Sequence, residues 1–168
     1  SKFSSIGNKK SAGTKLVCLD SFFNNPGVYE IDMGTPMKKI FNEIGGGYKE
    51  DVKAFQIGGP LGGVVPLTEI DNLNLDFQEF TAKGFMLGHA SVVSIPKDFP
   101  MTEYIHHLFE FSAEESCGKC FPGRLGSYRG KEMFDQVKKK TSKIPLKLLN
   151  ELLITMQKGC LCALCGAI

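Results

Sequence analysis

Two clusters of cysteines, separated by about forty residues, restrict what this chain can fold into more than any other feature of its sequence. Five of the six cysteines lie in them: Cys117 and Cys120 in the first cluster, and Cys160, Cys162 and Cys165 in the second. In each cluster a Cys-x-x-Cys pair can direct two thiolates toward one centre from a single tight turn, and Gly118 permits the backbone bend that the first pair needs. Two such pairs supply the four thiolates that an iron-sulfur cluster or a structural zinc ion requires. The spacing leaves the choice of metal open, but it predicts a fold that returns the second segment to the first.

Composition narrows the class of protein. The chain has 168 residues, of which 42% are hydrophobic and 23% are charged, and a net charge of +2. These values are typical of a soluble globular protein with one ordinary domain or two small ones, and the charge is too small to predict binding to nucleic acid. No apolar run approaches the ~20 residues of a membrane helix, and the first residues lack the apolar region of a signal peptide. Clustered cysteines without a secretion signal favour metal binding over disulfides. We therefore expect a reducing compartment, either the cytoplasm or an organelle matrix, with any membrane association made through a complex.

The first half of the sequence predicts a small sheet. Residues 1–13 are polar and without periodicity, which predicts a flexible lead-in. Apolar runs at 15–19 and 28–31 flank the turn signal Asn-Asn-Pro-Gly and predict a β-hairpin. A helix should follow, with Thr35 as its N-cap, Pro36 in its first turn and three glycines at its end. With a strand predicted at 52–57, the order strand, strand, helix, strand is that of a β-grasp (ubiquitin-like) domain.

The second half predicts a small helical bundle. The glycine-rich loop at 58–63 lacks the Lys-Ser/Thr of a phosphate-binding loop and is interpreted as a turn, while the apolar strand at 90–95 is expected to close the sheet. Beyond a proline-containing linker at 96–100, apolar residues recur at helical spacing in three stretches, the last ending at Gly159. The predicted class is α+β: a flexible lead-in at 1–13, a β-grasp domain at 14–96 and a helical iron-sulfur-binding domain at 100–168.

The residues around the cysteines resemble a known family. Glu-Ser-Cys-Gly-Lys-Cys-x-Pro-x-Arg-x-Gly at 115–126, followed by Cys-Ala-Leu at 162–164, resembles the cluster-binding segment of the flavin- and NADH-binding subunit of respiratory complex I and of related NAD-linked hydrogenases and formate dehydrogenases. The stretches at 13–15, 24–30, 33–36 and 58–63 are similar to the soluble-ligand-binding β-grasp domain of the same subunits. The resemblance covers nearly all of residues 13–166.

In that family four cysteines hold one [4Fe-4S] cluster, and the resemblance assigns three of the four ligand positions to Cys117, Cys120 and Cys162. The fourth position is occupied by Gly123, whereas Cys165 stands where the family usually has glycine, as though one thiolate had moved to the second segment. The ligand set implied for this chain is Cys117, Cys120, Cys162 and Cys165, with Cys160 as a substitute for the fourth ligand.

The function implied by the resemblance is one-electron relay between a partner's flavin and other redox centres, with no catalytic residue of its own. The family's large flavin- and NADH-binding segment has no counterpart in these 168 residues, so no FMN or NAD site is expected and the chain should not oxidise NADH alone. The implied partners are a flavin/NADH-binding subunit and ferredoxin-like iron-sulfur subunits. Nearby cations are expected to favour the reduced cluster, namely Lys119, Arg124, Arg129 and Lys131. Two alternatives stay open: a zinc-binding interaction module and a metal-free structural subunit.

Overall fold

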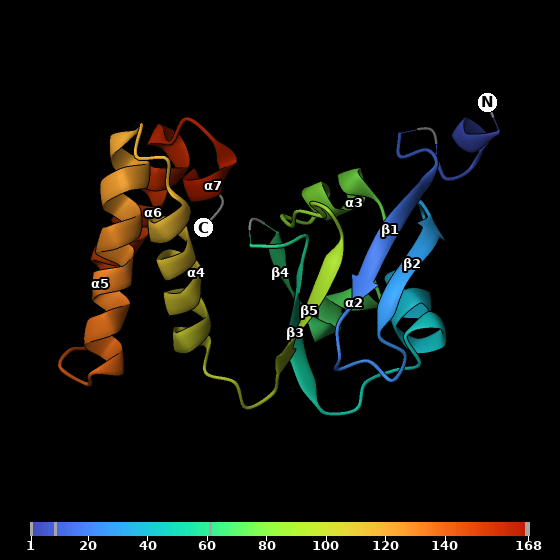
Figure 1. Cartoon of the computed structure of the whole chain (residues 1–168), viewed down its shortest axis with the longest axis horizontal. Helices are drawn as coiled ribbons and strands as arrows, with labels where there is room; N and C mark the ends of the chain where they lie inside the picture. The colour runs from blue at the N-terminus through green and yellow to red at the C-terminus, as the bar shows by residue number, and fades with distance from the viewer. Residues whose placement is uncertain (1, 9, 61, 167–168) are drawn as a thin grey trace. The chain divides into compact units, whose positions relative to one another are not determined.

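The computed structural model describes residues 2–8, 10–60 and 62–166, which fall into two compact units, Ser1–Lys97 and Asp98–Ile168. The first unit contains a five-stranded sheet with short helices, and the second is helical (Figure 1). The predicted α+β class is therefore confirmed. Among the described residues no helix is both long and apolar enough to span a membrane.

The sheet of the first unit has the strand order β2-β1-β5-β3-β4. Its strands are β1 (Thr14–Leu19), β2 (Gly27–Asp32), β3 (Val52–Ile57), β4 (Gly63–Pro66) and β5 (Ser91–Pro96). The β1–β2 pair is antiparallel, as the predicted hairpin requires. The strand expected to close the sheet, β5, instead lies in its middle, parallel to β1 and antiparallel to β3 (Figure 1). Strand β4, which directly follows the glycine-rich loop, was not predicted.

Aromatic rings fill the centre of the first unit. Phe41 packs against Phe55 with 4.8 Å between ring centroids and against Phe23 at 5.1 Å, and all three side chains are fully buried. A β-carbon at Gly45 would lie only 2.6 Å from a carbon of the Phe23 ring. The glycine predicted to end the helix thus also lets the chain pass closely over this aromatic core.

The predicted helix in the first unit is present but begins differently. It consists of α1 (Met37–Lys39) and the π-helical turn η2 (Ile40–Ile44), and it buries Met37, Ile40 and Phe41. The hydroxyl of Thr35 donates to the carbonyl oxygen of Asp32 at 2.8 Å rather than capping the helix. The N-cap role predicted for Thr35 was therefore wrong, because a turn before the helix engages its hydroxyl.

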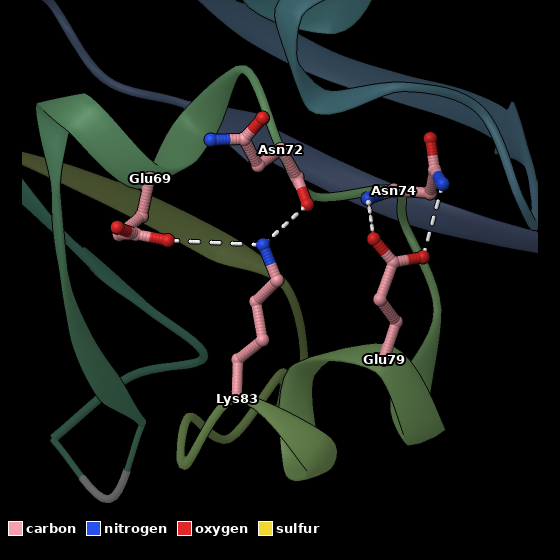
Figure 2. A network of polar contacts seen from close by, with 5 residues as sticks. All are labelled: Glu69, Asn72, Asn74, Glu79 and Lys83. Carbon is pink, nitrogen blue, oxygen red and sulfur yellow. Dashed lines mark hydrogen bonds and ion pairs between the residues drawn. The ribbon is translucent and has the colours of Figure 1, made fainter.

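Polar contacts fix the connection between two short helices, α2 (Leu67–Ile70) and α3 (Phe77–Ala82) (Figure 2). Lys83 Nζ donates to the carbonyl oxygen of Asn72 at 2.7 Å and lies 3.7 Å from a carboxylate oxygen of Glu69. The Glu79 carboxylate accepts from the backbone and side-chain amides of Asn74, at 3.0 and 2.9 Å. This loop therefore keeps a defined path although it contains no strand or helix.

The N-terminal segment makes hydrogen bonds to the rest of the first unit. Residues Phe3–Ser5 form the 3-10 turn η1, and Gly7 and Ala12 form an isolated antiparallel bridge. The side-chain amide of Asn8 donates to the Asp76 carboxylate, which also caps α3 by accepting from the backbone amides of residues 78 and 79. A segment expected to be a flexible lead-in thus makes specific contacts at residues 2–8 and 10–13.

Asp76 should make the stability of the first unit depend on pH. Burial favours the neutral acid, but hydrogen bonds from Asn8, Glu79 and Gln78 together hold the pKa of Asp76 below its ordinary value. A carboxylate with a lowered folded-state pKa contributes stability above its unfolded pKa of about 3.9, and this contribution is lost as the pH falls through the folded value. Asp76→Ala should therefore cost about 1 kcal/mol at pH 7, a typical value for a lost N-cap, and progressively less in acid.

Guanidinium unfolding of Asp76→Ala and the parent protein at pH 7 and at about pH 3 would measure this difference. Asp71→Ala is a matched control, because the Asp71 side chain is exposed and pairs only at the surface with Lys38. Equal costs of Asp76→Ala at both pH values would contradict the assignment.

The second unit is a small bundle with a short helix at one end (Figure 1). Its elements are α4 (Met101–Glu115), the π-helical turn η3 (Pro122–Gly126), α5 (Ser127–Lys138), α6 (Leu146–Gly159) and α7 (Ala163–Gly166). Helix α6 ends at Gly159 as predicted, whereas α7 was not predicted. Helices α4 and α5 run side by side, and Phe109 of α4 stacks on Phe134 of α5 with centroids 5.8 Å apart. A β-carbon at Gly130 would lie 2.1 Å from the Phe109 ring, so this glycine sets the close approach of the two helices.

Candidate functional site

The first cysteine segment leaves the C-terminal end of α4. Gly118 lies between the two cysteines with φ +72°, a conformation that favours glycine, and its amide donates to Ser116 Oγ at 3.3 Å. Cys117 is exposed, whereas Cys120 is half-buried just before η3. The Cys-x-x-Cys segment therefore forms a tight turn, the conformation on which the predicted pair of thiolates depends.

The turn η3 anchors this segment to α5. The fully buried hydroxyl of Ser127 donates to the carbonyl oxygen of Gly123 at 2.5 Å, and the Arg124 amide donates to the carbonyl oxygen of Cys120 at 3.0 Å. π-Helical turns are rare and are frequent at functional sites. The role of Ser127 was not predicted, because it depends on the π-helical turn that places its hydroxyl against Gly123.

The second cysteine segment lies between α6 and α7. Cys160 caps the end of α6, and its amide donates to the carbonyl oxygen of Met156 at 3.0 Å. Cys162 is exposed, whereas Cys165 lies in α7 with only 3% of its surface exposed. The short helix α7 thus turns one thiol of the second cluster into the core of this unit.

The two segments meet at the sulfur of Cys120. This sulfur accepts hydrogen bonds from the backbone amides of Leu161, in the second segment, and of Gly123. The thiol of Cys160 lies in hydrogen-bonding contact with the sulfurs of both Cys120 and Cys165. The structure therefore brings together Cys120, Cys160 and Cys165, while Cys117 and Cys162 are the exposed cysteines of the same two segments.

The surroundings of the three sulfurs affect their protonation differently. Hydrogen bonds from the amides of Leu161 and Gly123 hold the pKa of the Cys120 thiol below its ordinary value. Burial raises the pKa of Cys160 to about 12 and also raises the pKa of Cys165. The backbone thus favours a thiolate at Cys120, the form in which cysteine binds a metal.

The donor set fits a thiolate-held group. Among residues 2–8, 10–60 and 62–166, no three His, Cys, Asp or Glu side chains already surround the position of one metal ion. Five thiols occur in two segments that contact each other, and Cys thiolates are the ligands that hold iron-sulfur clusters, so these residues fit such a cluster.

Two of the four cations expected to act on the cluster are engaged elsewhere. Arg129 pairs with Glu132 at 3.0 Å, and Lys131 pairs with Glu110 at 2.9 Å. Arg124 instead lies over the Phe121 ring at 5.0 Å from its centroid, and a β-carbon at Gly118 would lie 3.6 Å from its side chain. Arg124 is therefore a cation that the structure places against the first cysteine turn, within which Lys119 also lies.

Known proteins similar to this chain include subunits of oxidoreductases and hydrogenases. Residues 103–168 match the family model described as the NADH-ubiquinone oxidoreductase-F iron-sulfur binding region. The chain is 33% identical over 165 residues to NADP-reducing hydrogenase subunit HndC of Solidesulfovibrio fructosivorans, a match that covers 96% of this chain and 34% of the relative. It is 31% identical over 166 residues to the mitochondrial NADH-ubiquinone oxidoreductase 51 kDa subunit of Aspergillus niger, again covering 96% of this chain and 34% of the relative. The chain thus spans about a third of the length of these curated relatives.

A solved structure shows the same fold. A chain of an NAD+-reducing [NiFe]-hydrogenase in the H2-reduced state superposes with a TM-score of 0.85 at 22% sequence identity, covering 99% of this chain and 28% of that chain.

Proposed function

We propose that this chain relays single electrons within an NAD(P)H-linked oxidoreductase complex. The premise is that the chain is homologous to the 51 kDa subunits of NADH-ubiquinone oxidoreductases and to subunits of NAD(P)-reducing hydrogenases, and that it carries their iron-sulfur binding region. The electrons would pass between a partner's flavin and other redox centres. The proposal concerns a component of such a complex, because the chain spans only about a third of its curated relatives.

The proposed ligands are Cys117, Cys120 and Cys162, with Cys165, or Cys160 as its substitute, as the fourth. A [4Fe-4S] cluster supplies reversible one-electron chemistry when bound, and it needs no acid, base or nucleophile from the protein. The role of this chain is to hold the thiolates and to set their environment. The amides of Leu161 and Gly123 stabilise negative charge on the Cys120 sulfur, and Arg124 adds a positive charge beside the first turn.

The observation that carries the proposal is the meeting of the two cysteine segments at Gly123, where an added β-carbon would lie 2.9 Å from the Cys120 sulfur and 3.2 Å from the Cys165 sulfur. The two segments lie about forty residues apart in the sequence, and the family resemblance assigns Cys120 as a ligand.

The surface near the cysteines favours a protein partner. Phe121 is 69% exposed and Leu161 is 72% exposed, and each adjoins a cysteine in the sequence. Large exposed apolar side chains next to a site often mark an interaction surface. A flavin/NADH-binding subunit or a ferredoxin-like iron-sulfur subunit is the partner that an electron relay would require here.

Anaerobic reconstitution with iron and sulfide tests the proposal. We expect about four iron atoms per chain and a broad visible absorption band that bleaches on reduction with dithionite. Bound zinc without visible absorption would instead support the metal-stapled interaction module, and a colourless, metal-free protein would support the structural subunit. Either result would reject the relay function.

A further inference from the structure

Gly123 has no side chain, and two sulfur atoms lie close to the space that a side chain there would fill. A β-carbon added at Gly123 would lie 2.9 Å from the Cys120 sulfur, 3.2 Å from the Cys165 sulfur and 3.6 Å from the Cys165 β-carbon. The two distances to sulfur are tighter than ordinary contacts, so the missing side chain is what admits Cys165 beside Cys120. The buried thiol on α7 thus lies where a side chain on η3 would otherwise lie.

Cys165 also contacts the first segment at a second point. The hydroxyl of Ser116 makes a hydrogen bond to the Cys165 sulfur, and the same hydroxyl accepts from the amide of Gly118 inside the Cys-x-x-Cys turn. A buried polar group needs a hydrogen-bond partner, so Ser116 orients Cys165 toward the turn between Cys117 and Cys120.

Cys160 lies differently. It is half-buried at the C-terminal end of α6, and its β-carbon would lie 3.8 Å from a β-carbon added at Gly166. The two sulfurs nearest to a β-carbon at Gly123 are those of Cys120 and Cys165.

From these contacts we infer that Cys165, admitted by Gly123, supplies the fourth thiolate of the metal site, and that Cys160 is not a ligand. This inference rests on the proposed function and deepens it. It separates two cysteines between which the sequence alone leaves the choice open.

Three variants test the inference after anaerobic reconstitution, with iron and sulfide content as the main readout. The iron content of Cys165→Ala should fall from about four atoms per chain to less than about one, whereas the iron content of Cys160→Ala should stay at about four.

The third variant controls for misfolding of Cys165→Ala. The double variant Gly123→Cys/Cys165→Ala places a thiol on η3 and removes the thiol on α7. It should therefore regain about four iron atoms per chain. The helical circular dichroism of all three variants should match that of the parent protein.

The outcomes separate this inference from the proposed function. A parent protein without iron rejects the relay function itself. A parent protein with about four iron atoms leaves that function standing, and the inference is then overturned by any of three results: Cys165→Ala keeps its iron, Cys160→Ala loses it, or a helical double variant does not regain it.

Discussion

Replacing Cys120 by serine is expected to remove iron from this protein almost completely, from about four atoms per chain to less than about one. Cys120 is the point at which the two cysteine segments meet, because its sulfur accepts from the amides of Leu161 and Gly123 and contacts the thiol of Cys160. Serine at this position places a shorter, harder oxygen there, which binds iron poorly and cannot reproduce these contacts. Iron and sulfide analysis with the visible spectrum after reconstitution would measure the loss.

The matched control for this change is Cys18→Ser. Cys18 is the one cysteine outside the two clusters, and it is half-buried in β1, where it pairs with Val28. Its substitution removes a thiol without touching the site, so iron content should stay at about four atoms per chain. Equal iron content in Cys120→Ser and Cys18→Ser would mean that iron is held at another place.

Phe109→Ala should destabilise the helical unit by about 3–5 kcal/mol, the usual cost of emptying a buried aromatic site. Phe109 is fully buried, stacks on Phe134, and fills the space left by Gly130 between α4 and α5. Because the first cysteine segment follows directly from α4, this change should also reduce cluster retention. Guanidinium unfolding followed by helical circular dichroism would measure the stability difference.

Phe121→Ala provides the comparison. The same aromatic ring is removed from the same unit, but Phe121 is 69% exposed, and surface changes of this kind usually stay within about 0.5 kcal/mol. Similar destabilisation by the two variants would show that Phe109 does not hold the α4–α5 contact.

Long periodic elements could be predicted from the sequence, whereas short ones could not. The apolar spacing of α6 and its end at Gly159 were sufficient to place that helix, as were the two runs that flank the turn before β2. Helix α7 and strand β4 have only four residues each, too few to show a period. The position of β5 in the sheet could not be predicted either, because the residues of an apolar strand do not indicate which strands it pairs with.

The same distinction applies to the candidate site. Cysteine spacing was enough to predict that two segments converge, but it did not indicate which thiols of the second segment point inward. That direction depends on the turn between α6 and α7, which leaves Cys162 exposed and buries Cys165. Ser116 and Ser127 could not be identified beforehand, because their roles depend on a tight turn and a π-helical turn.

The central place of β5 in the sheet has a consequence for how this protein forms during translation. The hairpin β1–β2 and the pair β3–β4 both leave the ribosome before β5. Strand β5 then joins the two pairs, because it bonds to β1 on one side and to β3 on the other. A nascent chain that has not reached residue 96 therefore exposes the edges of β1 and β3. Pairings between residues so distant in sequence form slowly, and exposed edges invite intermolecular pairing. The interval between synthesis of β4 and of β5 is thus the period in which the newborn chain has the most unpaired strand edge to offer another chain.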